Sequence, residues 1–269
     1  MKKHAFITLA LITTTRCNLN CGHCLLGDRK NNDMSDEIIE ATLNQTAYAS
    51  TLTICGGENT LILNRLEKII TYIIEKRINI DELTITINGT IYTPELFRLL
   101  EEIDNYIGKE IVNATFAISL DKYHLSEIKR LGIYAEFLEN FKRYKESKYF
   151  YGTRGIDIPP FREGNAILLP KETTVPLRPT KKYLTYLKNG KFDKNGICLI
   201  GPDISVNPSG TITECDASCI NQEIKYNYGN VLNDSFEETI LKNGAHILKP
   251  KRFLKATQKE WKRFCTYTK

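Results

Sequence analysis

The chain has 269 residues, a formal net charge of +5 at pH 7, and 42% hydrophobic and 26% charged residues. This length and composition exclude a disordered or low-complexity chain and allow one large domain, or a domain with an appendage. The mild positive charge does not demand nucleic acid as a partner, and no apolar run is long enough to span a membrane. Eight cysteines without a recognisable secretion signal favour metal or cluster ligation in a reducing, cytoplasmic compartment over disulfides.

Apolar strand patterns alternate with helical patterns along the first 150 residues. Strands are predicted at 6–12, 51–55, 83–87 and 115–120, and helices at 35–49, 61–76, 93–106 and 125–148. This alternation predicts parallel strands joined by right-handed crossovers, as in a whole or partial α/β barrel. In such barrels the functional residues gather at the carboxyl ends of the strands.

Three cysteines, Cys17, Cys21 and Cys24, follow the first predicted strand. Three thiolates in one tight loop can bind three irons of a cubane cluster, whereas closed clusters and structural zinc sites usually have four protein ligands. The loop therefore leaves one coordination position open for a substrate or cofactor. A structural zinc ion that takes a fourth ligand from elsewhere is the alternative.

The C-x3-C-x2-C spacing of this loop resembles the signature of the radical S-adenosylmethionine (SAM) enzymes. The resemblance implies a [4Fe-4S] cluster on the three cysteines, with SAM bound through its amino and carboxylate groups to the open iron. It implies a reaction that begins with a 5′-deoxyadenosyl radical, and a flavodoxin or ferredoxin as the reductant. His23 occupies a position that is usually aromatic in the family. It is a candidate for packing on the adenine, or for a supporting role outside the ligands.

Segments after the next three predicted strands also resemble motifs of this family. Gly56, Gly57 and Glu58 look like its GGE motif, in which glycines let the backbone approach the methionyl group of SAM and an acidic residue or an exposed carbonyl accepts its ammonium hydrogens. Cys55, inside the apolar strand before them, is expected to be a small buried hydrophobic residue. Asn88 begins a turn similar to the one that follows the third strand in these barrels.

The segment from Ser119 to His124 looks like the S-x-D-x-x-H segment of a subset of these enzymes. In that case Ser119 contacts the ribose or carboxylate of SAM, and Asp121 faces the substrate. The alternative for Asp121 is to cap the next helix, and His124 is expected to be structural.

The last third of the chain has its own cysteine pattern. The spacing of Cys198 and Cys215 resembles the opening of a SPASM/twitch auxiliary iron-sulfur domain, with a hairpin at 206–213 that turns at Pro-Ser-Gly. We expect at most one auxiliary [4Fe-4S] cluster, bound by Cys198, Cys215 and Cys265. Cys219 is either the fourth ligand or a thiol that donates hydrogen to the substrate. Zinc at these four cysteines is the alternative.

The predicted fold is therefore α/β. It consists of a partial (β/α)6 TIM-like barrel at 1–168, a linker at 169–194, and a small auxiliary domain at 195–269 made of a β-hairpin and a helix. The basic end at 249–263 could suggest nucleic acid, but an amphipathic helix that packs onto the barrel is preferred.

The motifs together look closest to the small peptide epimerases of the family. A ribosomally made peptide is the expected substrate, modified by epimerisation, crosslinking or oxidation. Asp216 follows Cys215 where the epimerases have a second cysteine, so epimerisation would require Cys219 as the hydrogen donor. The alternatives are a dehydrogenase or epimerase of a small molecule such as an aminocyclitol, and a non-catalytic zinc-binding or nucleic-acid-binding module.

Overall fold

The computed structural model describes residues 3–27, 31–108, 110–155, 158–175, 185–187, 198–214, 227–242 and 246–247. Its strands are β1 (His4–Thr14), β2 (Thr46–Gly56), β3 (Asn79–Ile87), β4 (Ala114–Ser119), β5 (Phe150–Arg154), β6 (Thr185–Leu187), β7 (Cys198–Val206), β8 (Thr211–Glu214), β9 (Gly229–Asn230) and β10 (His246–Ile247). Its α-helices are α1 (Asp36–Asn44), α2 (Leu63–Glu75), α3 (Glu95–Ile107), α4 (Lys122–Arg130), α5 (Tyr134–Lys145) and α7 (Phe236–Lys242). The 3-10 helices are η1 (Asn59–Leu61), η2 (Gly164–Leu168) and η3 (Lys171–Thr173).

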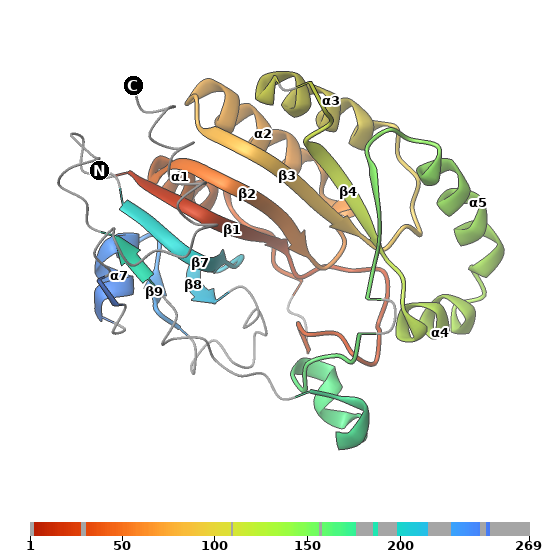
Figure 1. Ribbon diagram of the computed structural model, residues 1–269. Coiled ribbons are helices and arrows are strands. Elements are labelled where there is room, and N and C mark those ends of the chain that lie inside the picture. Colours follow the sequence, from red (N-terminus) through yellow and green to blue (C-terminus); the bar gives the residue numbers. More distant parts are fainter. Residues whose placement is uncertain are drawn as a thin grey trace.

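The described strands form one sheet whose main order is β10-β6-β7-β1-β2-β3-β4-β5, with β8 and β9 continuing from β7. Neighbouring strands from β1 to β5 pair in parallel, and β7 pairs in parallel with the other side of β1. In Figure 1, α1, α2 and α3 lie along one face of this curved sheet. The predicted α/β class with a parallel sheet, consistent with a partial TIM-like barrel, is confirmed.

The helices bury apolar stripes against the parallel strands. On α2, Leu66, Ile69, Ile70 and Ile73 recur at helical spacing and are each fully buried. They belong to one continuous core cluster that includes residues of β1, β2, β3 and β4. Burial on this face fixes the strands in register, so that their carboxyl ends meet at one edge of the sheet, where the polar segments follow.

Two predicted helices end differently in the structure. The helix predicted at 35–49 ends at Asn44, and β2 starts two residues later. Tyr48 is buried in that strand and its hydroxyl donates to Asp81, so tertiary packing overrides the helical period there. The helix predicted at 125–148 is divided into α4 and α5 at Gly132, which has a left-handed φ of 74°.

The predicted hairpin at 206–213 is confirmed, because β7 and β8 pair in antiparallel fashion around a turn in which Gly210 donates to Asn207. Residues of the predicted auxiliary domain therefore share a sheet with the predicted barrel. The backbone of Cys198 pairs with His4 at the amino-terminal end of β1, opposite the cysteine loop. Three other predicted ligands lie outside the described residues: Cys215, Cys219 and Cys265. The division into barrel, linker and auxiliary domain stays a prediction.

Candidate functional site

A cavity of about 430 Å³ opens at the carboxyl ends of β1 to β5. Each of these strands, or the loop after it, contributes to the wall, which is the edge where a parallel barrel places its chemistry. The residues that concern the site are Cys17, Cys21, His23, Cys24, Cys55, Gly56, Gly57, Asn88, Ser119, Asp121, His124 and Arg154. Most of the predicted cofactor-binding residues are thus brought together, and so are the three cysteines of the loop.

The start of the cysteine loop is tied to the end of β1. Arg16 forms a bidentate ion pair with Asp33, which also accepts a hydrogen bond of 2.6 Å from the Thr14 hydroxyl. The carboxylate thereby links the strand end to the chain that leaves the loop. Such bidentate arginine pairs fix geometry as well as adding energy.

The middle of the loop rests on α4 and α5. The backbone N–H of Asn20 donates to the carboxylate of Glu127 at 3.0 Å, while Leu19 and Cys21 pack against Ile128 and Phe137. The loop is therefore anchored by one charged hydrogen bond and a small apolar cluster.

Segment 164–166 fixes the end of the loop. Asn165 donates from its backbone N–H to the Cys24 carbonyl at 2.9 Å and from its side chain to the Cys21 carbonyl at 3.2 Å. Gly164 has a φ of 54°, and a Cβ there would lie 2.3 Å from the Cys24 carbonyl oxygen. This segment holds two of the three ligand-bearing residues in place.

The two glycines of the Gly-Gly-Glu segment are required by the backbone of the cysteine loop. A Cβ on Gly57 would lie 1.8 Å from the Arg16 carbonyl oxygen, and one on Gly56 would lie 2.5 Å from that of Thr14. Two hydrogen bonds of 2.7 Å join the segments, from Gly57 N–H to Thr14 and from Glu58 N–H to Arg16. Side chains are excluded at these two positions because two loops of the protein itself lie in close contact.

Glu58 lies beneath the cavity rather than in its wall. The carboxylate is fully buried and accepts hydrogen bonds from the Thr60 N–H at 3.0 Å, the Thr60 hydroxyl at 2.7 Å and the Asn88 N–H at 2.6 Å. Burial raises the pKa of Glu58, although these hydrogen bonds oppose the shift. The structure therefore places Glu58 as a link between the segments after β2 and β3.

Asn88 connects the segment after β3 to the cysteine loop. Its side-chain amide donates to the Asn18 oxygen at 2.8 Å and lies 3.8 Å from the Cys17 sulfur. Its own oxygen accepts from the N–H and hydroxyl of Thr90, which fixes the amide orientation. An amide N–H held toward a thiolate stabilises the charged sulfur and so supports metal ligation.

Asp121 joins two histidine rings at the cavity wall. One carboxylate oxygen caps α4 by accepting from the N–H groups of Tyr123 and His124, and the other lies 2.7 Å from His124 Nδ1 and 3.1 Å from His23 Nε2. Burial alone would raise the pKa of Asp121, but hydrogen bonds from both histidines outweigh it and hold the pKa well below its usual range. Asp121 thus both caps the helix and orients the rings.

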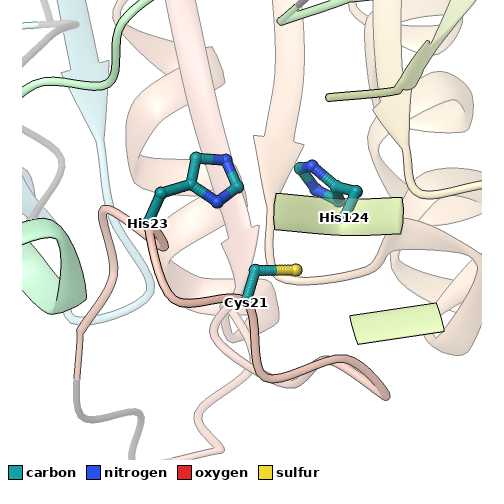
Figure 2. A group of neighbouring side chains, drawn as sticks. All are labelled: Cys21, His23 and His124. Carbon is teal, nitrogen blue, oxygen red and sulfur yellow. The ribbon is translucent and has the colours of Figure 1, made fainter. Parts of the chain in front are cut away.

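The ring of His23 is packed as an aromatic residue would be. It stacks on Tyr123 at 4.8 Å between centroids and meets the edge of His124 at 4.9 Å. Figure 2 shows both histidine rings beside the Cys21 sulfur, and one ligand atom from each of the three lies within 4.8 Å of the others. This side of the loop is therefore rich in metal-ligating atoms.

The donor set fits an iron-sulfur cluster. Burial, together with the neighbouring charges of Cys17 and Cys24, raises the pKa of the Cys21 thiol far above its ordinary value. A bound cation reverses this effect, because a coordinating thiol is deprotonated outright. A three-cysteine cluster site requires three thiols at the wall of one cavity, as found here. One of them, Cys21, is unfavourable as a thiolate unless a cation is bound.

Cys55, expected to be a small buried hydrophobic residue, is half-buried and also lines the cavity. Burial raises its pKa to about 11, and the charge that opposes this shift is that of Arg154. Ser119 lies at the end of β4, next to Arg154 at the end of β5.

Several contributors to the site were not found from the sequence. Glu127 and Asn165 act through hydrogen bonds to the loop from distant positions, and no local pattern marks them. Asn165 follows Gly164 in the chain. That glycine is the one signal in the sequence that could have indicated a close contact between this segment and another part of the backbone. Arg154 is the last residue of a short strand that the predicted alternation did not include.

The model of the Radical SAM superfamily matches residues 11–173 of the chain. Among curated proteins, the uncharacterized protein MJ0907 of Methanocaldococcus jannaschii is 26% identical over 243 residues, which cover 77% of this chain and 84% of that protein.

Two solved structures are similar to this chain. One is anSMEcpe with bound AdoMet and Cp18Cys peptide (TM-score 0.51, 16% identity, 88% of this chain and 80% of that chain). The other is SuiB of Streptococcus suis bound to the precursor peptide SuiA (TM-score 0.40, 14% identity, 86% of this chain and 63% of that chain). In the part of the chain that the structure describes, no helix has the length and apolar character that crossing a membrane requires.

Proposed function

The chain belongs to the radical SAM superfamily, and on that premise we propose that it is an enzyme that removes a hydrogen atom from a peptide substrate. The observation that carries the proposal is the three-cysteine loop, which lines one cavity at the carboxyl ends of the parallel strands. When bound, a [4Fe-4S] cluster on Cys17, Cys21 and Cys24 and SAM at its open iron supply the electron and the 5′-deoxyadenosyl radical.

The protein's own part is to bind, orient and shield these groups. Ser119 and Arg154, on the neighbouring ends of β4 and β5, are suited to the hydroxyl and carboxylate groups of the cofactor. His23, which Asp121 orients and Tyr123 stacks on, offers a flat surface for its adenine. Cys55 and Arg154 line the same cavity.

A peptide substrate is proposed because the solved relative anSMEcpe carries a bound peptide together with AdoMet in a similar fold. The reaction is an epimerisation, a crosslink or an oxidation, and Cys219 is the proposed donor if hydrogen is returned to the substrate. Solvent-deuterium incorporation into the product separates hydrogen return from oxidation. A flavodoxin or ferredoxin in a reducing, cytoplasmic compartment is the proposed electron source. A small molecule such as an aminocyclitol is the alternative substrate.

An auxiliary [4Fe-4S] cluster on Cys198, Cys215 and Cys265, with Cys219 as a fourth ligand or a donor, is retained as a proposal. In an oxidation it would accept the electron from the substrate radical. A Cys219→Ala variant separates the two roles of that thiol, because loss of iron indicates ligation, whereas full iron content with altered product indicates donation.

The direct test of the enzyme proposal is formation of 5′-deoxyadenosine from SAM by anaerobically reconstituted protein with a reductant. We expect product with the wild-type chain and none with Cys17→Ala, Cys21→Ala or Cys24→Ala. Gly22→Ala is the matched control in the same loop, since a Cβ there meets no atom within 4 Å. Equal product from the wild type and the cysteine variants would contradict the proposal.

A second candidate is a non-catalytic zinc-binding module, which the grouping of Cys21, His23 and His124 favours. A carboxylate that orients histidines in this way is common behind zinc ligands. This candidate predicts one zinc per chain after purification from zinc-containing medium and no charge-transfer absorption after anaerobic reconstitution with iron and sulfide.

A further inference from the structure

A second hollow of about 520 Å³ adjoins the cofactor cavity. It lies between the first turn of α4 and the segment after β5, and Thr173 of η3 lines it as well. Both hollows are within the range of about 300–1,000 Å³ that ligand pockets occupy. The residues that line both hollows are Asp121, Tyr123, Gly155, Ile158, Pro159 and Pro160. The second hollow, here called the substrate groove, therefore adjoins the cavity, and these six residues are here called the shared rim.

The wall of the substrate groove is mostly apolar. Leu120 and Leu125 line it, and Ile158, at the shared rim, is 71% exposed. The carboxylate of Asp121 also lines the groove, and two histidines and the start of α4 hold it in place. An exposed apolar wall beside a reaction cavity favours an apolar side chain of a ligand.

One positive charge stands at the edge of this groove. Lys122 is exposed, lies over the ring of Tyr123 at 5.0 Å, and has no carboxylate partner within the described ranges. It occupies the first position of α4, where the helix dipole disfavours a cation. An anionic group of a ligand would offset that cost.

We propose that the substrate groove binds the part of the peptide that flanks the reacting residue. An apolar side chain lies between Leu125 and Ile158, and an aspartate or glutamate of the peptide pairs with Lys122. The reacting residue then lies at the shared rim, between the groove and the cofactor cavity. This inference rests on the proposed function, because it specifies the substrate class of the same site.

The test is selection of a random dodecapeptide library on the full chain, anaerobically reconstituted and saturated with SAM. We expect peptides with a Leu, Ile, Val or Phe at a fixed spacing from an acidic residue, with an acidic preference of about two- to fivefold, as for an exposed ion pair. Lys122→Glu is expected to replace the acidic residue by Lys or Arg. Thr173→Trp, which narrows the groove, is expected to shift the apolar preference toward Ala.

Lys142→Glu, on the exposed surface of α5, is the matched charge-reversal control and is expected to leave the selected sequences unchanged. Selection without an acidic preference, or a preference that Lys122→Glu does not alter, overturns the inference. Formation of 5′-deoxyadenosine by the wild-type chain without peptide is measured in parallel. If 5′-deoxyadenosine forms while selection shows no preference, only the assignment of the groove fails. If no 5′-deoxyadenosine forms, the proposed function itself is overturned.

Discussion

Replacing Gly57 by alanine should separate the Gly-Gly-Glu segment from the cysteine loop. The new Cβ would lie 1.8 Å from the Arg16 carbonyl oxygen, a distance that no small adjustment relieves. The two segments must move apart, which breaks the hydrogen bonds from Gly57 to Thr14 and from Glu58 to Arg16. Each buried N–H left without a partner costs about 1–3 kcal/mol. The free energy of unfolding should therefore fall by about 2 kcal/mol or more.

For a chain of this size such a loss corresponds to a fall in Tm of about 4–8 °C. The assay is urea and thermal unfolding of the reduced, metal-free chain, followed by its iron content after reconstitution. Gly22→Ala is the control, because the added methyl meets no atom within 4 Å and should change stability by less than about 1 kcal/mol. Equal stability of Gly57→Ala and Gly22→Ala would refute the packing argument, and with it the explanation of why this segment contains glycine.

Other variants test the remaining links around the site. Asn165→Ala removes the 3.2 Å hydrogen bond to the Cys21 carbonyl, worth about 1 kcal/mol, so iron release to a chelator should be about fivefold faster. Because burial raises the folded-state pKa of Glu58, wild-type stability relative to Glu58→Gln should fall as pH rises from about 4.3 through that raised value; a pH-independent difference would contradict this. A triple alanine variant of the loop cysteines should keep the iron of one auxiliary cluster, and complete loss of iron would exclude that cluster.

The parallel sheet was predictable because its signals are local. Each of the first four strands is an apolar run next to a helical period, and that alternation leaves few topologies. The start of β2 was missed because Tyr48 is placed by a hydrogen bond to Asp81, 33 residues away, which no window of sequence reveals. The position of β7 beside β1 was missed for the same reason, since a long connection separates the two strands in the chain.

The site was predictable where spacing alone determines geometry. Cys17, Cys21 and Cys24 lie in one loop, so their convergence follows from the sequence. The role of Glu58 differs, because its side chain points into the protein and links two loops, and a motif does not specify the direction of a side chain. For Asp121 the structure shows the predicted capping role, since one carboxylate oxygen accepts from the start of α4. The other oxygen contacts two histidines, and the predicted role of facing the substrate stays a prediction.

An open coordination position on a cluster bound by three cysteines can be measured by electron–nuclear double resonance. The sample is the reduced, reconstituted protein with SAM that carries ¹⁵N in its amino group. We expect an electron paramagnetic resonance signal that changes when SAM is added, and a ¹⁵N coupling that reports direct ligation of iron. A signal that SAM leaves unchanged, with no ¹⁵N coupling, would contradict it.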